Sequence, residues 1–176
     1  MAALSQARRG TAFWVACGLG TGLSPVAPGT VGSLAALAVG VAILGVAPAW
    51  LPLAAAVATS GGLWAVRASG ADRAPGGDPG WVVVDEVAGQ WIALLPLALL
   101  PAAAAWNPPS LLLAFLAFRA LDILKPGPVG WADRQEGAFG VMADDVIAGG
   151  LAALLVMGAQ FLWPAWFAAP HTAFLG

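Results

Sequence analysis

Charged side chains are scarce in this sequence of 176 residues. Seven Lys or Arg and nine Asp or Glu make up 9% of the chain, whereas 60% of its residues are hydrophobic. Ordinary soluble domains contain about 25% charged residues, so this chain has too few polar side chains to cover a surface that faces water. The composition therefore predicts an all-α, polytopic membrane protein, and the length predicts one domain covering residues 1–176.

Cysteine is also scarce, and several phosphatase motifs are missing. The one cysteine, Cys17, excludes an intramolecular disulfide and a Cys-rich metal site, and no C-x₅-R loop surrounds it. The sequence has no D-x-D-x-[TV] stretch, which would supply the aspartyl nucleophile of a familiar class of phosphatase. It also lacks the D-G-x₂-A-R core of enzymes that join alcohols to CDP-lipids. The basic residues are mostly interleaved with acids, so we expect no nucleic-acid partner, and no feature indicates a protein partner.

Long hydrophobic runs predict about five transmembrane helices. Residues 31–66 are apolar throughout and exceed one span of about 20 residues, so the prolines and Trp50 near their middle indicate two spans joined by a turn. Further spans are expected at residues 83–100, 110–124 and 146–163. Arg8 and Arg9 precede a short, glycine-broken apolar stretch, which we interpret as an interfacial N-terminal segment rather than a cleaved signal.

With five spans, every charged side chain falls on one side of the membrane. All seven Lys and Arg share that side, so the positive-inside rule predicts that it is cytoplasmic. The only histidine, His171, then lies on the opposite side, which argues against a His-dependent lipid phosphatase. Polar chemistry at one leaflet favours an enzyme acting on a lipid in that leaflet over a transport path.

Two pairs of adjacent acids are expected at the starts of two spans. Asp85 and Glu86 occur in "VVVDEVAGQW", and Asp144 and Asp145 occur in "MADDVIAG". Helix capping would explain one acid per helix. Two acids at each helix start are better explained by a hard divalent ion, because neighbouring carboxylates repel unless a cation lies among them.

Other polar residues suggest a phosphate-binding role. Arg119, Asp122 and Lys125 have the spacing of one helix face, where the alternatives are a ladder of ion pairs or two cations for a phosphate with a carboxylate for a metal. The glycine- and proline-rich segment at residues 20–33 offers Thr30 and Ser33 as hydroxyl donors. The chemistry that remains is metal-assisted attack of water on a phosphoryl group, with a carboxylate accepting the proton.

Four blocks, in this order, resemble the bacterial phosphatidylglycerophosphatase A family: "GLGTGLSPVAPGTVGSLAA", "VVDEVAGQW", "FRALDILKPGPVGWADR" and "GVMADDVIAG". The resemblance implies an inner-membrane, Mg²⁺-dependent phosphatase that converts phosphatidylglycerophosphate to phosphatidylglycerol, with its active site facing the cytoplasm. It also points to Asp133 and Arg134 as matched polar positions.

The expected site is as follows. Its catalytic acids are Asp85, Glu86, Asp122, Asp144 and Asp145; its substrate-binding residues are Thr30, Ser33, Arg119, Lys125 and Arg134; and its Mg²⁺ ligands are Asp85, Glu86, Asp144 and Asp145. Which carboxylate is the base stays open, as does the number of ions. The alternatives are a phosphatase for another lipid phosphate, and a small membrane transporter or scaffold.

Overall fold

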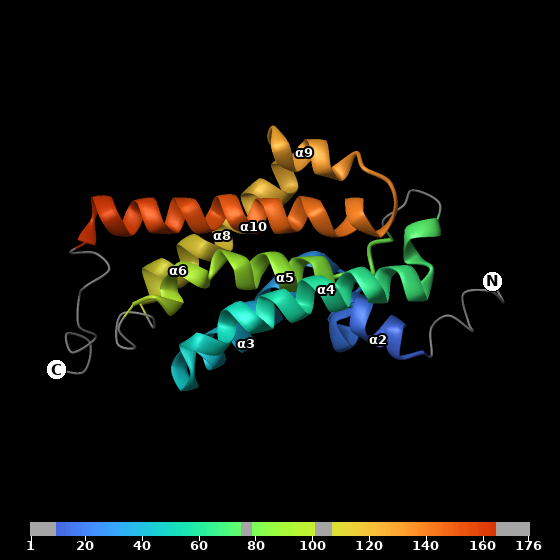
Figure 1. Cartoon of the computed structure of the whole chain (residues 1–176), viewed down its shortest axis with the longest axis horizontal. Helices are drawn as coiled ribbons and strands as arrows, with labels where there is room; N and C mark the ends of the chain where they lie inside the picture. Colours follow the sequence, from blue (N-terminus) through green and yellow to red (C-terminus); the bar gives the residue numbers. More distant parts are fainter. Residues whose placement is uncertain (1–9, 75–78, 101–106, 165–176) are drawn as a thin grey trace.

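The computed structural model describes residues 10–74, 79–100 and 107–164. These residues form helices, turns and loops without any strand, so the predicted all-α class is confirmed. Figure 1 shows the long helices side by side along the longest axis of the molecule, with α10 beside α5.

The first half of the chain forms a helical hairpin preceded by short helices. Prolines at the first or second helical position start α3 and α4, where the missing proline N–H is no loss because those amides have no intrahelical partner. The elements are α2 (Thr11–Ala16), η1 (Gly18–Leu23), α3 (Pro28–Val46), η2 (Pro48–Trp50), α4 (Leu51–Ser69) and η3 (Ala71–Arg73).

The second half supplies the central helix and the longest helix. In chain order its elements are α5 (Val84–Ala93), α6 (Leu95–Ala98), α8 (Pro108–Leu124), α9 (Pro128–Asp133) and α10 (Gly137–Leu162). Helix α5 packs against α3, α4, α8 and α10 and thus lies at the centre of the bundle. Its small residues Ala88, Gly89 and Ala93 are buried, which allows these neighbours to approach closely.

Among the described residues, three helices are long and apolar enough to cross a membrane: Pro28–Val46, Pro48–Ser69 and Gly137–Leu162. They correspond to the first, second and fifth predicted spans. The expected span at residues 83–100 is instead divided into α5 and α6, because Pro96 cannot donate a helical hydrogen bond and the turn breaks at Leu94. Helix α8 has 17 residues, at the lower end of the range of about 17–25 residues for a membrane span. The predicted helical membrane bundle is confirmed, whereas its number of five spans stays a prediction.

Helix α10 begins earlier than expected. The sequence placed Asp144 and Asp145 at the start of a span, but the helix starts at Gly137 and has no acid in its first turn. Both aspartates are therefore about two turns inside the helix. The prediction of their position was wrong, and capping can be dismissed for this pair because the orphan amides of a helix lie in its first turn.

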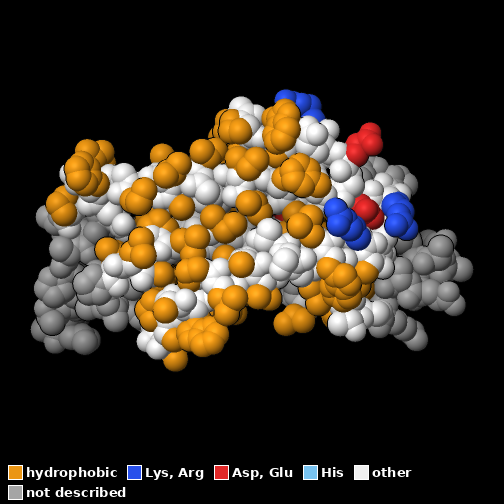
Figure 2. All heavy atoms as spheres, viewed as in Figure 1, with side chains coloured by type: hydrophobic (Ala, Val, Ile, Leu, Met, Phe, Trp, Pro, Cys, Tyr) orange, Lys and Arg blue, Asp and Glu red, His pale blue; other side chains and the backbone are white. Residues whose placement is uncertain are grey.

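The charged side chains gather at one end of the bundle. On the face shown in Figure 2, Lys, Arg, Asp and Glu lie near the first turns of α10, and the rest of the described surface shows hydrophobic side chains among backbone and uncharged groups. The chain reverses direction between α3 and α4, between α4 and α5, and again between α8 and α10. The end of α4 and the starts of α5 and α10 therefore lie at the same end of the bundle (Figure 1).

Candidate active site

Helix α5 contributes two carboxylates from its first turn. Asp85 is 6% exposed, and its Oδ1 accepts a hydrogen bond of 3.1 Å from the backbone N–H of Glu86. No side chain caps this helix. The two acids nevertheless benefit from the positive end of the helix dipole, so a structural contribution from both is compatible with a role as ligands.

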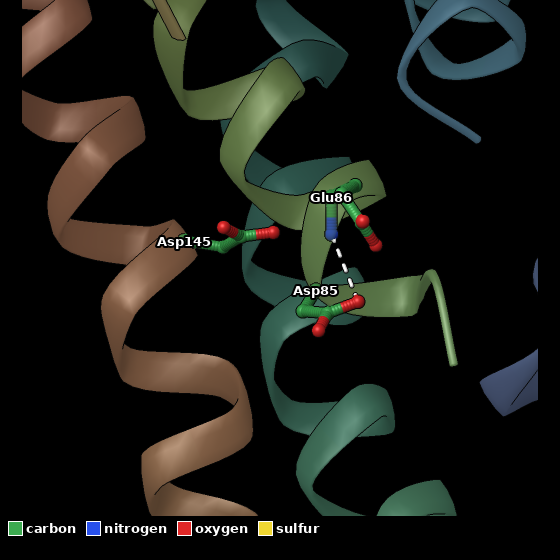
Figure 3. A group of neighbouring side chains, drawn as sticks. All are labelled: Asp85, Glu86 and Asp145. Carbon is green, nitrogen blue, oxygen red and sulfur yellow. Dashed lines mark hydrogen bonds between the residues drawn. The ribbon is translucent and has the colours of Figure 1, made fainter. Parts of the chain in front are cut away.

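Helix α10 contributes the second pair, in which Asp145 faces α5 and Asp144 contacts Lys125 at the end of α8. Asp144 and Asp145 are 6% and 3% exposed. Figure 3 shows the Asp145 side chain extending from α10 towards the first turn of α5, where Asp85 and Glu86 lie. Helix packing therefore brings together acids that are about 60 positions apart in the sequence.

Oxygen atoms of these acids form two overlapping groups. In the first, Asp85, Glu86 and Asp145 each offer an oxygen, and all three oxygens lie within 4.8 Å of one another. In the second, Asp122 from α8 joins Asp144 and Asp145 at the same spacing. Asp145 belongs to both groups and is the central carboxylate of the site.

Arg119 is the first of two cations among these carboxylates. Its Nη1 lies 2.5 Å from Asp122 Oδ2 and 3.8 Å from Glu86 Oε1. The same nitrogen donates a 3.4 Å hydrogen bond to Ser33 Oγ on α3. The predicted pairing of Arg119 with Asp122 on one face of α8 is thus present, and it extends to α5 and α3.

Lys125 is the second cation, and it does not share that helix face. Helix α8 ends at Leu124, and Lys125 adopts a left-handed backbone with φ 46°. Its Nζ lies 2.5 Å from Asp133 on α9 and 2.5 Å from Asp144 on α10. Burial alone would lower the pKa of Lys125, but the hydrogen bonds to these two carboxylates outweigh it and raise the pKa above its usual value. The amine is therefore a permanent cation.

The residues present fit a bound divalent cation. The two cations Arg119 and Lys125 face six carboxylates, so the acids exceed the cations by four charges when all are ionised. The six are Asp85, Glu86, Asp122, Asp144 and Asp145 of the two groups, and Asp133 beside Lys125. Glu86 Oε2 and Asp144 Oδ1 are buried and have no hydrogen-bond partner in the described part of the chain. An oxygen-binding cation, or a water molecule bound to it, would satisfy both atoms, and the cation would offset the repulsion.

The remaining predicted residues lie at different distances from this cluster. Ser33 is buried and contacts Arg119. Thr30 lies in the first turn of α3. The residue before it, Gly29, lies against the Glu86 carboxylate, because a Cβ added to Gly29 would collide with that carboxylate. Arg134 is exposed at the end of α9 and forms no ion pair with any described residue. The structure thus brings Ser33, but not Arg134, into contact with the cluster.

Two further polar residues were not assigned a role from the sequence. Asp133 is one of the two carboxylates that form ion pairs with Lys125. Gln90 is 0% exposed on α5, one turn after Glu86, and neither of its amide atoms has a partner among the described residues. A lone amide within the apolar stretch "VAGQWIALL" was the available signal, since an unpaired buried amide is costly.

An apolar pocket of about 340 Å³ lies elsewhere, between α3 and α5 and beneath η1. Val84, Val87 and Trp91 line it from α5, and its lining includes no charged residue. It is therefore distinct from the carboxylate cluster.

Comparisons with known proteins agree on one family. The family model described as phosphatidylglycerophosphatase A matches residues 14–160. A Bacteroides thetaiotaomicron protein named, provisionally, as a phosphatidylinositol-3-phosphatase is 37% identical over 84% of this chain and 92% of its own length.

Two other relatives are both named phosphatidylglycerophosphatase A. The one from Escherichia coli K12 is 35% identical over 85% of this chain and 84% of its own length. The one from Haemophilus influenzae is 37% identical over 84% of this chain and 87% of its own length. No solved structure matches. The matched region contains every carboxylate and cation of the cluster, and the chain belongs to the phosphatidylglycerophosphatase A family.

Proposed function

We propose that this protein is a Mg²⁺-dependent phosphatase that hydrolyses phosphatidylglycerophosphate to phosphatidylglycerol and phosphate. The observation that carries the proposal is the cluster of five buried or half-buried carboxylates from α5, α8 and α10, with two unpartnered oxygens, in a chain of this family. The excess negative charge of these carboxylates would bind a hard cation such as Mg²⁺, and the bound cation would bind phosphate oxygens of the substrate.

Asp85, Glu86 and Asp145 would hold the ion, because their oxygens form the group nearest the start of α5. When bound there, Mg²⁺ would lower the pKa of a coordinated water and neutralise charge on the phosphate. Asp144 is the best-placed base: Lys125 fixes its Oδ2, while its Oδ1 is unpartnered and free to accept a proton from the attacking water.

Lys125 and Arg119 supply positive charge for the phosphate oxygens. Each is already held by two carboxylates, so neither side chain has to be ordered when the substrate arrives. As water attacks phosphorus and the bond to the glycerol oxygen breaks, charge builds up on the phosphoryl oxygens, and fixed cations stabilise it without reorganisation.

The active site is proposed to face the cytoplasm of a bacterial inner membrane. All seven Lys and Arg lie in the segments that the sequence places on one side, and the positive-inside rule assigns that side to the cytoplasm. The gathering of charge at one end of the bundle supports this orientation (Figure 2).

A phosphatase for a different lipid phosphate is the second candidate. The provisional name of the Bacteroides thetaiotaomicron relative refers to phosphatidylinositol 3-phosphate, and a carboxylate-and-cation site recognises the phosphate rather than the rest of the head group.

The deciding experiment is phosphate release from purified protein in detergent. Phosphatidylglycerophosphate, phosphatidylinositol 3-phosphate and phosphatidic acid would be compared, each with Mg²⁺ and with EDTA. We expect Mg²⁺-dependent turnover and a preference for phosphatidylglycerophosphate. A preference for another lipid would transfer the proposal to that substrate, and full turnover in EDTA would contradict the metal.

A further inference from the structure

Helices α5 and α10 are in backbone contact at a pair of glycines. A Cβ added to Gly149 on α10 would lie 2.9 Å from both the Cα and the carbonyl carbon of Gly89 on α5 and would overlap the Gly89 carbonyl oxygen. A Cβ added to Gly89 would lie 2.6 Å from the backbone oxygen of Asp145 and would overlap the Phe118 ring. Neither helix can move closer, and neither position can accept a side chain without separating the helices.

The glycine contact is in register with the acids. Gly89 follows Asp85 by four residues, and Gly149 follows Asp145 by four residues. Residues four apart lie on the same face of a helix, one turn from each other. The contact is therefore one turn deeper than the Asp85 and Asp145 carboxylates, which face each other across the same helix pair (Figure 3).

We propose that Gly89 and Gly149 are positioning residues: their contact sets the separation of the Asp85 and Asp145 carboxylates and thereby the affinity of the site for a divalent cation. This inference rests on the proposed function, since it needs a cation at the carboxylates. A Mg²⁺ ion holds its ligands at about 2.0–2.1 Å in near-ideal octahedral geometry, so a small increase in the spacing of two helices removes one ligand from reach.

A purely structural role would predict a different result. If the glycines served packing alone, substitution would lower stability and leave cation affinity unchanged in the protein that remains folded. If they position the acids, cation affinity falls in the folded protein, and a higher cation concentration restores activity.

The chain offers a matched control next to the test position. Gly150 is also on α10, and a Cβ added there meets nothing within 4 Å. Gly149→Ala and Gly150→Ala make the same chemical change with the same gain in helix propensity, but only the first pushes on α5. Gly89→Ala tests the contact from the other helix.

The main measurement is Mn²⁺ binding to the detergent-solubilised full chain, followed by electron paramagnetic resonance and needing no turnover. We expect Gly149→Ala to weaken Mn²⁺ binding about 10–100-fold, the range for changes that misplace metal ligands. Gly150→Ala should bind Mn²⁺ as wild type does. Phosphate release by Gly149→Ala should recover as the Mg²⁺ concentration is raised.

Two results would overturn the inference. One is unchanged Mn²⁺ affinity in folded Gly149→Ala and Gly89→Ala, and the other is failure of both variants to fold while Gly150→Ala folds, which would assign the contact to stability. A wild-type protein that binds no Mn²⁺ would instead overturn the proposed metal function itself, so the two failures are distinguishable.

Discussion

Replacing Asp145 by asparagine is the sharpest test of the site. Asparagine keeps the shape of aspartate and much of its hydrogen bonding but removes the negative charge. Asp145 is 3% exposed and is the one carboxylate that both acid groups share. Its loss therefore weakens a cation site however the remaining acids divide their roles.

The structure sets the size of the expected effects. Two unit charges 4.8 Å apart repel by about 3.5 kcal/mol at an effective dielectric constant of about 20. Arg119 and Lys125 offset part of that repulsion, so we expect metal-free Asp145→Asn to be more stable than metal-free wild type by about 1 kcal/mol or more. Turnover should fall about 10²-fold or more, as expected when one essential catalytic carboxylate is lost.

The assay pairs turnover with thermal unfolding, each with Mg²⁺ and with EDTA. At a Mg²⁺ concentration 100 times its dissociation constant, wild type should gain about 2.7 kcal/mol of stability, and Asp145→Asn should lose most of that gain. Glu136→Gln is the matched control, because Glu136 is an exposed acid at the start of α10 with no ion pair among the described residues.

One combination of results would refute the reasoning. If Asp145→Asn keeps wild-type turnover and the same stabilisation by Mg²⁺, the cluster is not a cation site. Lower stability of the metal-free variant would show that Asp145 serves the packing of α10 rather than repelling its neighbours.

Three further predictions concern the cations and the topology. Lys125→Met should raise KM about tenfold or more, because a hydrogen bond to a charged group contributes about 1.5–3 kcal/mol. Steady-state kinetics over a range of lipid concentrations would check this. An unchanged KM would show that Lys125 does not bind the phosphate. Arg119→Met leaves two half-buried carboxylates, Glu86 and Asp122, without their cation. It should destabilise the fold by up to about 3–5 kcal/mol in EDTA but less in Mg²⁺, as measured by unfolding. In a Cys17→Ala background, Val46→Cys and Arg73→Cys should react with an impermeant thiol reagent from opposite faces of the membrane, and labelling from one face would contradict the orientation.

The sequence alone determined the class of protein and most of its helices. Hydrophobic runs interrupted by proline located the helices Pro28–Val46 and Leu51–Ser69, because burial of apolar surface in lipid depends on composition and length rather than on distant contacts. The acid pairs at Asp85 and Asp144 were equally visible, since few charges occur in such a chain and each one is costly to bury.

Helix boundaries near the site were less predictable. The start of α10 at Gly137 could not be read because "GAFGVMA" has neither a proline nor a strong capping residue, whereas the two aspartates that follow it are typical of a helix start. The break at Leu94 was missed because apolar residues continue on both sides of it, although Pro96 was a signal for it in the sequence.

Only the tertiary structure decided which charged groups meet. Asp122 joins Asp144 and Asp145 because α8 and α10 lie against each other, and Lys125 leaves the face of Arg119 because its backbone turns left-handed at the end of α8. The contact of Gly89 with Gly149 likewise depends on the crossing of two helices that are far apart in the chain. Local sequence specifies which residues form a helix, whereas the approach of two helices depends on packing between surfaces that no local pattern encodes.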